Sequence, residues 1–212
     1  MNEKVYSVGF MFLVAFFFTF LVSAVKLTNE DRIERNKQAK LQKTIIQVLG
    51  IQTKEHMSAE DLSRLFDERV ETIQLEDKNV YVGYERNREK IIGYAFPVGG
   101  PGFWGAIQGM VAVAPDASKI IGIEFYNHNE TPGLGARISE PWFSEQFSGL
   151  PLYPIEGDDQ IFYLNPEREG KAHNELDAIT GASRTSDAVE RFLNRDLNLF
   201  LREFKGLIKE RS

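Results

Sequence analysis

An uncharged stretch near the start of the chain constrains its architecture more than any other feature. Residues 5–25 read VYSVGFMFLVAFFFTFLVSAV, and Lys4 and Lys26 bracket these 21 residues. A helix rises by about 1.5 Å per residue, so this length is enough to span a hydrocarbon layer of roughly 30 Å. The stretch therefore predicts a single transmembrane helix.

A cleaved signal peptide is the alternative interpretation, because Val22-Ser23-Ala24 has the small residues of a cleavage site. The apolar run is longer than the core of about 7–15 residues that signal peptides have, so we favour an uncleaved anchor. Basic residues favour the cytoplasmic side of a membrane. Lys4 precedes the segment and four basic residues follow within 26–37, so charge alone would place the remainder of the chain inside.

The composition excludes several functional classes. The chain has 31 acidic and 25 basic residues, and a formal charge of -6 repels nucleic acid. The absence of cysteine rules out disulfides, thiolate-bound clusters and thiol catalysis. His56, His128 and His173 are too far apart to form a pair on one helix turn, so no histidine metal site is predicted.

Helical patterns follow the apolar segment. Residues 26–55 carry an intermittent apolar stripe among charges, which predicts a helical stalk with Gly50 as its stop. A second helix is predicted from Ser58, and its apolar stripe continues through Val70 and Ile73. We therefore assign residues 26–77 to the stalk and the first helices of the domain.

The pattern changes to strands from about residue 78. Four runs rich in β-branched and aromatic residues lie at 79–86, 90–98, 106–114 and 119–127. Short polar links join them, which indicates an antiparallel sheet.

Mixed elements follow the four runs. A short helix is predicted at 141–147 and a strand at 160–164. The end of the chain has apolar residues at a period near 3.6, which predicts a long C-terminal helix. The expected fold class is α+β, with one domain at 78–212 that has a mainly antiparallel sheet and flanking helices.

The stretch DAITGASRTS, residues 177–186, lies directly before the C-terminal helix and carries the most chemical information. Asp187 and Glu190 are expected in the first turn of that helix, as an N-terminus prefers. Gly181 permits a sharp turn, and free amides at a helix start favour a phosphate. An N-cap with a turn is the simpler reading, and the residues alone predict no covalent bond. The hydroxyl groups belong to Thr180, Ser183, Thr185 and Ser186.

This stretch resembles the flavinylation motif of the FMN-binding domain family, which includes the NqrC component of the sodium-pumping NADH:quinone oxidoreductase (Nqr) and the RnfG component of the Rnf complex. The resemblance places Ser183 at the acceptor of a covalent FMN phosphoester, where threonine is usual. Asp177 matches the acidic position at which the flavin transferase motif begins. The other motif positions implied at the cofactor are Thr180, Gly181, Ala182, Thr185 and Ser186.

Two other stretches support the resemblance. Residues 129–135, NETPGLG, are similar to the family loop that lies against the flavin ring, although Pro-Gly by itself indicates only a type II turn. Residues 100–105, GPGFWG, are similar to a glycine-tryptophan element whose simpler reading is a core tryptophan. Glu130 either tunes the ring or holds the loop, and both readings stay open. The positions implied at the flavin are Glu130, Thr131, Gly133, Leu134, Gly135 and Trp104.

The resemblance implies a membrane-anchored electron-transfer subunit with covalent FMN, acting within an Rnf-type or Nqr-type ion-translocating oxidoreductase complex. Its implied partners are the integral membrane and redox subunits of that complex, the lipid bilayer and a flavin transferase for maturation. It implies a single-pass inner-membrane protein with residues 1–4 as a cytoplasmic tip and 78–212 as an FMN-binding domain on the periplasmic side.

Two alternatives remain open at this point. One is a stand-alone extracytoplasmic flavoprotein reductase that passes electrons to a soluble acceptor. The other is a non-redox membrane-anchored binding module in which the motif is vestigial. Copurification of membrane subunits distinguishes a redox subunit of a complex from the stand-alone reductase. Flavin colour distinguishes it from the binding module.

Overall fold

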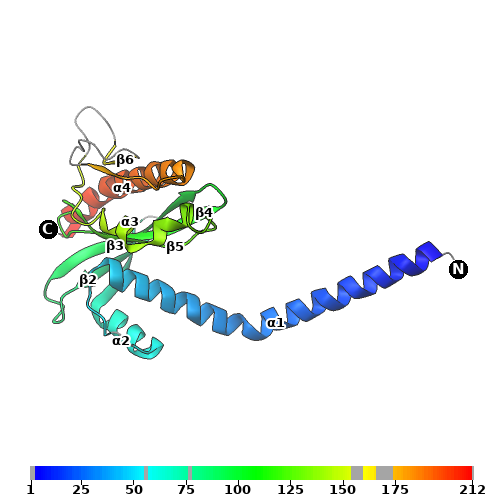
Figure 1. The fold of residues 1–212 in the computed structure, drawn as a ribbon. Helices are drawn as coiled ribbons and strands as arrows, with labels where there is room; N and C mark the ends of the chain where they lie inside the picture. The colour runs from blue at the N-terminus through cyan, green and yellow to red at the C-terminus, as the bar shows by residue number, and fades with distance from the viewer. Residues whose placement is uncertain (1–2, 55–56, 76–77, 154–159, 166–173, 212) are drawn as a thin grey trace. The chain divides into compact units, whose positions relative to one another are not determined.

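The computed structural model describes residues 3–54, 57–75, 78–153, 160–165 and 174–211. The chain forms two compact units, Met1–Leu41 and Gln42–Ser212. The described part of the first unit consists of helix alone, and the second unit contains the sheet with the helices that cover it (Figure 1).

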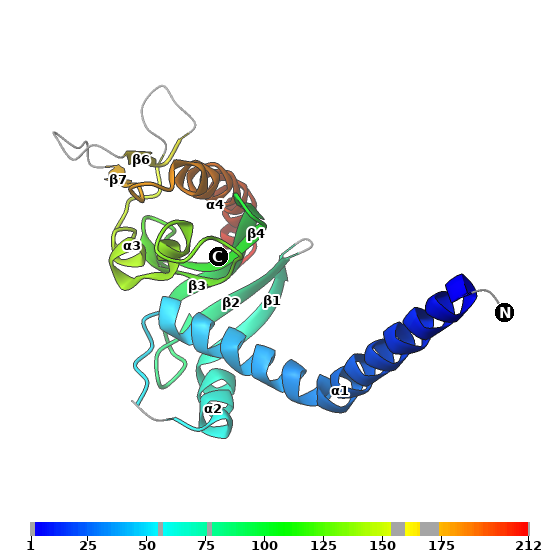
Figure 2. The same cartoon turned by 45° about the vertical axis from the view of Figure 1, so that its right-hand side comes forward.

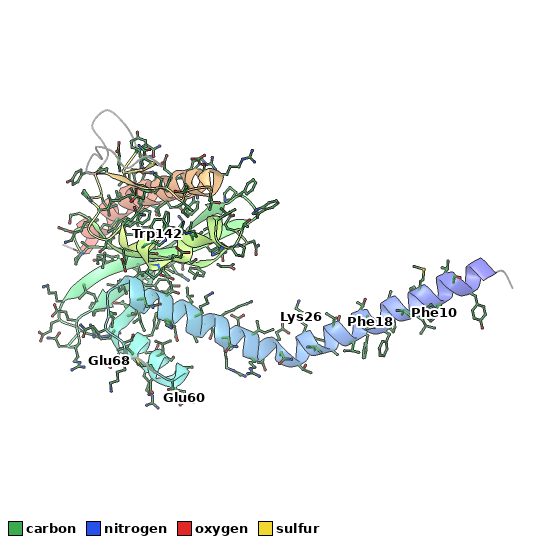
Figure 3. The ribbon with its side chains drawn as sticks, in the orientation of Figure 1. Phe10, Phe18, Lys26, Glu60, Glu68 and Trp142 are labelled. Carbon is green, nitrogen blue, oxygen red and sulfur yellow. The ribbon has the colours of Figure 1, made fainter. Side chains whose placement is uncertain are left out.

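Helix α1, Glu3–Val48, contains the apolar segment. The mean hydropathy of its most apolar window is 2.5, and none of that window is buried. The side chains of Phe10 and Phe18 project outward from it, 68% and 61% exposed (Figure 3). By length and composition α1 can cross a membrane, a property that signal sequences near an N-terminus share. The helix ends just before Gly50, whose φ of 69° only glycine adopts readily, as the sequence predicts.

Five strands form one antiparallel meander in the order β1-β2-β3-β4-β5. The strands are β1 (Val70–Leu75), β2 (Lys78–Tyr84), β3 (Ile91–Pro101), β4 (Ala106–Val113) and β5 (Ile120–Asn127). Each strand pairs with its neighbour in sequence, so short hairpins connect the whole sheet.

The structure has a strand, β1, where the sequence predicted the continuation of the second helix. Helix α2, Ala59–Arg69, begins as expected, with the Ser58 side chain accepting a hydrogen bond from the Asp61 amide. It ends at Arg69, however, and Val70 and Ile73 lie in β1 instead of continuing the helix. Both are β-branched, and pairing with β2 outweighs an apolar spacing that also fits a helix.

Helix α4, Ser183–Arg211, lies across one face of the sheet (Figures 1 and 2). Aromatic pairs join it to β3: the rings of Phe96 and Phe200 stack with centroids 3.9 Å apart, and Tyr94 meets Phe204 edge-on at 4.6 Å. Such pairs add roughly 0.5–1.5 kcal/mol each beyond their burial. This packing fixes the position of α4 relative to β3.

The last turn of α1 and the residue that follows it belong to the same unit as the sheet. Ile45, Ile46 and Leu49 are buried, with at most 3% of each exposed. A Cβ added at Gly83 would lie 3.0 Å from the Leu49 side chain, so glycine there lets Leu49 approach the strand closely.

Smaller elements complete the domain. They are a 3-10 helix η1 (Gly135–Ser139), helix α3 (Pro141–Glu145), and the strands β6 (Tyr163–Asn165) and β7 (Glu175–Asp177). Strand β6 is shorter than the predicted strand at 160–164 and pairs in parallel with β7, which sequence reasoning did not find. The α+β class, the antiparallel main sheet and the long C-terminal helix are confirmed.

Candidate functional site

The loop after β5 forms the first wall of the candidate site. The Leu134 amide donates to the Thr131 carbonyl at 3.1 Å, and Gly133 has a φ of 74°. These are the marks of a type II turn, with Pro132 and Gly133 at its two central positions. The turn leaves Leu134 44% exposed, with its side chain beside Gly181, where an added Cβ would lie 3.3 Å from Leu134 Cδ2.

The tip of the β3–β4 hairpin forms the second wall. The Gly102 amide donates to the Gly105 carbonyl at 2.7 Å, which closes a tight turn around Phe103 and Trp104. Their ring centroids lie 4.8 Å apart. Trp104 is 64% exposed, so the reading as a core tryptophan is wrong.

The start of α4 forms the third wall. The amides of Thr185 and Ser186 both donate to the Ala182 carbonyl, at 3.1 and 3.0 Å. The amides of Ser183 and Arg184 lie at the open end of the helix, with no backbone acceptor among the described residues. Together with the exposed Ser183 hydroxyl they offer a group of donors suited to an anion.

Two acidic residues do not lie where the sequence suggested. Helix α4 begins at Ser183, and its first turn contains no acidic residue. Asp187 and Glu190 therefore fall beyond that turn. Burial raises the pKa of Glu190, with a smaller rise from the charge of Asp187, whereas a hydrogen bond from the Leu164 amide opposes both effects.

The three walls enclose a cleft of about 290 Å³. Eight of the residues singled out from the sequence line it, and they come from segments up to 55 positions apart. Two further residues, Phe103 and Arg184, also line it, and sequence reasoning did not select them. The eight expected residues are Glu130, Thr131, Leu134, Gly135, Gly181, Ala182, Ser183 and Thr185.

Glu130 holds the three walls together. Only 5% of it is exposed. Its Oε1 accepts hydrogen bonds from the amides of Phe103 at 2.8 Å and Trp104 at 3.1 Å, and its Oε2 accepts one from the Thr185 hydroxyl at 2.6 Å. One carboxylate thus joins the β3–β4 tip and the first turn of α4 to the loop after β5. Of the two roles left open, holding the loop is the one that these contacts support.

Two glycines let the backbone approach this carboxylate. A Cβ added at Gly102 would lie 2.6 Å from Glu130 Oε1, and one at Gly135 would lie 2.7 Å from Oε2 and 2.5 Å from Thr185 Oγ1. Real Cβ atoms do not approach so closely, so a side chain at either position would displace the carboxylate.

The remaining predicted residues lie outside the cleft lining. Ser186 is buried and its hydroxyl is engaged, accepting from the Ile179 amide and donating to the Ala182 carbonyl. Asp177 is the last residue of β7, and its amide donates to the Gln146 side chain at 2.6 Å. Thr180 and Gly133 belong to the turns beside the cleft, and Trp104 adjoins Phe103.

The two missed residues contact each other. The guanidinium carbon of Arg184 lies 5.1 Å from the centre of the Phe103 ring. Each is a sequence neighbour of a residue that was selected, Phe103 beside Trp104 and Arg184 beside Ser183. Neither the glycine-tryptophan element nor the acceptor motif specifies them, so only the folded arrangement reveals their contact.

Arg137, in η1 after the Pro-Gly turn, differs from Arg184 in having an acidic partner. Arg137 forms an ion pair with Glu140 at 3.1 Å and lies 5.1 Å from the ring of Trp142, which Figure 3 labels. A hydrogen bond from the Trp142 indole lowers the pKa of Glu140. Burial raises this pKa to a smaller extent than the indole lowers it, and Arg137 adds a further lowering.

One histidine does not itself line this cleft, and the other two fall outside the described residues. His128 contacts the Ser139 hydroxyl at 3.0 Å, while His56 and His173 fall outside the described ranges. In the part of the chain that the structure describes, no cluster of three or more histidine, aspartate or glutamate side chains could hold a metal ion.

Comparison with known families defines the class of this domain. Residues 102–198 match the FMN-binding domain, and this segment contains all three walls of the cleft. Residues 102–198 therefore match the family that the motifs predicted, and that prediction is confirmed for this segment.

Curated relatives show which proteins this segment is similar to. The chain is similar to the NqrC component of the Na(+)-translocating NADH-quinone reductase of Neisseria meningitidis, with 37% identity over 101 residues, 48% of this chain and 39% of that protein. The corresponding protein of Pasteurella multocida is likewise 37% identical over 94 residues, covering 44% of this chain and 35% of that protein. These matches span less than half the length of each relative.

Two solved structures share the fold. They are NqrC from Shewanella oneidensis and its counterpart from Parabacteroides distasonis, each with a TM-score of 0.68 and 21% identity. Each match covers 82% of this chain, with 99% of the first structure and 96% of the second. At 21% identity, this similarity shows a shared fold only.

Proposed function

We propose that this protein is a membrane-anchored electron-transfer subunit that holds FMN through a phosphoester to Ser183. The observation that carries the proposal is the place of Ser183. It is the first residue of α4, exposed, and it lines the same cleft as the type II turn at Thr131–Leu134. An acceptor hydroxyl and a ring-covering loop thus meet in a domain of the FMN-binding family.

The residues of the cleft fit the two ends of FMN. The Ser183 hydroxyl and the amides of Ser183 and Arg184 suit its phosphate. The exposed side chains of Leu134 and Phe103 offer apolar faces to a planar ring, and Thr131 offers a hydroxyl to its polar edge. When bound, FMN supplies the electron chemistry, since it takes up one or two electrons.

The remaining residues position the walls of the cleft and enclose the cofactor. Glu130 keeps the β3–β4 tip and α4 at a fixed separation, because its hydrogen bonds reach both. Gly181 has a φ of 79° and no side chain that would collide with Leu134. We assign Asp177 to recognition by the flavin transferase, Thr180 and Ala182 to the cofactor site beside Ser183, and Thr185 and Ser186 to the structure of the helix start.

The anchor and the relatives support a place in a membrane complex. Helix α1 can cross a membrane, and the similar proteins are subunits of a Na(+)-translocating NADH-quinone reductase. We propose that the chain relays electrons between the integral membrane and redox subunits of an Nqr-type or Rnf-type complex. In this proposal the FMN-binding domain lies on the periplasmic side of the inner membrane.

Variants at Ser183 test the assignment. The full chain is coexpressed with a flavin transferase, and in-gel flavin fluorescence is recorded after denaturation. Ser183→Ala should abolish the signal with unchanged circular dichroism, and Ser183→Thr should retain it. Ser186→Ala is the matched control, and it should also retain the signal. Covalent flavin in the Ser183→Ala protein would refute the site.

Purification in mild detergent from the native membrane tests the complex. Copurification of integral membrane subunits is the expected result. A flavin-loaded chain that purifies alone would instead favour the stand-alone reductase. A protein that stays colourless beside an active transferase would favour the binding module.

A further inference from the structure

Arg184 is a cation in the cleft with no anionic partner among the described residues. It is the second residue of α4, exposed, and its side chain lines the cleft. Among the described residues it forms no ion pair and no side-chain hydrogen bond, whereas Arg137 and Arg195 pair with Glu140 and Asp196. Among the described residues that line the cleft, Glu130 is the one acidic side chain, and three other donors occupy its carboxylate.

The Phe103 ring supports Arg184 without using its hydrogen-bond donors. The guanidinium carbon lies 5.1 Å from the ring centre, within the distance of a cation–π contact. A guanidinium packed on a ring keeps the N–H groups of its edge free, and these match a phosphate in geometry and charge. Arg184 is thus held at the cleft with its donors available.

The position of Arg184 relative to a phosphate follows from the chain itself. It is bonded directly to Ser183, and both residues line the same cleft. Any phosphate carried by the Ser183 hydroxyl therefore lies next to the backbone of Arg184, however the rest of the ligand is oriented. The amides of Ser183 and Arg184 at the start of α4 also have no backbone acceptor among the described residues.

We propose that Arg184 is a specificity-determining residue that selects phosphorylated flavins over neutral ones, and that Phe103 pre-orients it. The proposal rests on the proposed function. Arg184 contacts the phosphate end of the flavin, which distinguishes FMN from riboflavin. A phosphate monoester carries about 1.5 to 2 negative charges at neutral pH, whereas riboflavin has none there.

The test measures non-covalent binding in the full chain. The background is Ser183→Ala, produced without a transferase, so that no covalent bond contributes. FMN and riboflavin are titrated separately, and flavin fluorescence reports binding. Adding Arg184→Gln should weaken FMN binding by about fivefold, the scale of an exposed ion pair, and leave riboflavin binding unchanged. Arg184→Lys should give a smaller loss.

Two controls isolate the charge effect. Arg191 is exposed on the same helix and does not line the cleft, so Arg191→Gln should leave the FMN-to-riboflavin preference unchanged. Salt screens the ion pair between Arg184 and the phosphate. Raising the salt concentration should therefore reduce the preference for FMN more in the protein that retains Arg184 than in the Arg184→Gln protein.

Phe103 provides a second, independent test. In the same background, Phe103→Leu should reduce the FMN-to-riboflavin preference by about twofold to threefold, since a cation over an exposed ring contributes modestly. Any loss of contact with the flavin ring affects both flavins and cancels in this ratio. Once Arg184→Gln is present, Phe103→Leu should have no further effect on the preference. That non-additivity in a double-mutant cycle is expected only if Phe103 acts through Arg184.

Several outcomes would overturn this proposal. They are an equal loss for both flavins, no loss for either, or no detectable binding of either flavin to the Ser183→Ala protein. The proposed function is judged separately, by covalent flavin in the wild-type chain. Flavin on Ser183 with no Arg184 effect would refute only the selectivity, and an Arg184 effect without covalent flavin would refute only the phosphoester.

Discussion

The hydrogen bond between Thr185 and Glu130 gives the sharpest prediction about how the cleft is held together. Its 2.6 Å length joins the first turn of α4 to the carboxylate that also binds the β3–β4 tip. Thr185 is 2% exposed and Glu130 5%, so water has little access to replace the hydroxyl. Thr185→Val removes that donor and substitutes a methyl group of similar size.

The expected loss follows from burial and charge. A hydrogen bond to a charged group contributes about 1.5–3 kcal/mol to stability, and a buried acceptor left without its donor loses a similar amount. We therefore expect Thr185→Val to lower the free energy of unfolding by about 2 kcal/mol. Thr185→Ser keeps the hydroxyl and removes one buried methyl group, which costs about 0.8 kcal/mol.

The assay is urea unfolding of the full chain in detergent micelles, followed by tryptophan fluorescence. Trp104 lies on the hairpin tip that Glu130 holds, so its emission should also change before global unfolding in the valine variant. The hydrogen-bond account requires valine to be less stable than serine. If serine were the less stable of the two, packing of the methyl group would be the larger effect and the account would be wrong.

Three further changes probe other parts of the domain. Gly135→Ala should destabilise the protein by about 1–3 kcal/mol in thermal unfolding, because its Cβ would collide with Glu130 and Thr185; an unchanged midpoint would contradict the structure. Asn194→Leu should cost about 1–3 kcal/mol in urea unfolding, because the Asn194 side chain bonds the backbone of Ile161 and Phe162 in a buried setting; an unchanged midpoint would refute this. Because the pKa of Glu190 is raised, its folded state binds a proton more tightly than the unfolded state, so this contribution to stability is present at low pH and is lost as pH rises above the ordinary value. Glu190→Gln should therefore gain stability relative to wild type as pH rises from about 4 to 7 in thermal unfolding, and a constant difference would contradict the assignment.

Much of the fold was predictable because local patterns carry it. The runs at 106–114 and 119–127 became β4 and β5, since their β-branched composition and short links allow little else. Strand β1 was missed because the spacing of Val70 and Ile73 fits a helix as well as a strand, and only pairing with β2 decides between them. The parallel β6–β7 pair has three residues in each strand, too few to show a period.

The sequence motifs of the candidate site could be predicted, but the contacts between them could not. The acceptor stretch and the Pro-Gly turn are each contiguous in sequence, and the fold brings both to one cleft. The role of Glu130 depends on partners 26 to 55 positions away, which no local pattern records. The contact between Arg184 and Phe103 is likewise a product of the fold.

The attachment of FMN to Ser183 can be measured directly by mass spectrometry. The full chain is coexpressed with a flavin transferase, and its intact mass is determined before peptide mapping. If FMN is attached to Ser183, the mass increases by that of FMN minus one water, and the increase lies on the peptide that contains Ser183. An unmodified mass beside a transferase that modifies a known substrate, or a modification on another residue, would contradict it.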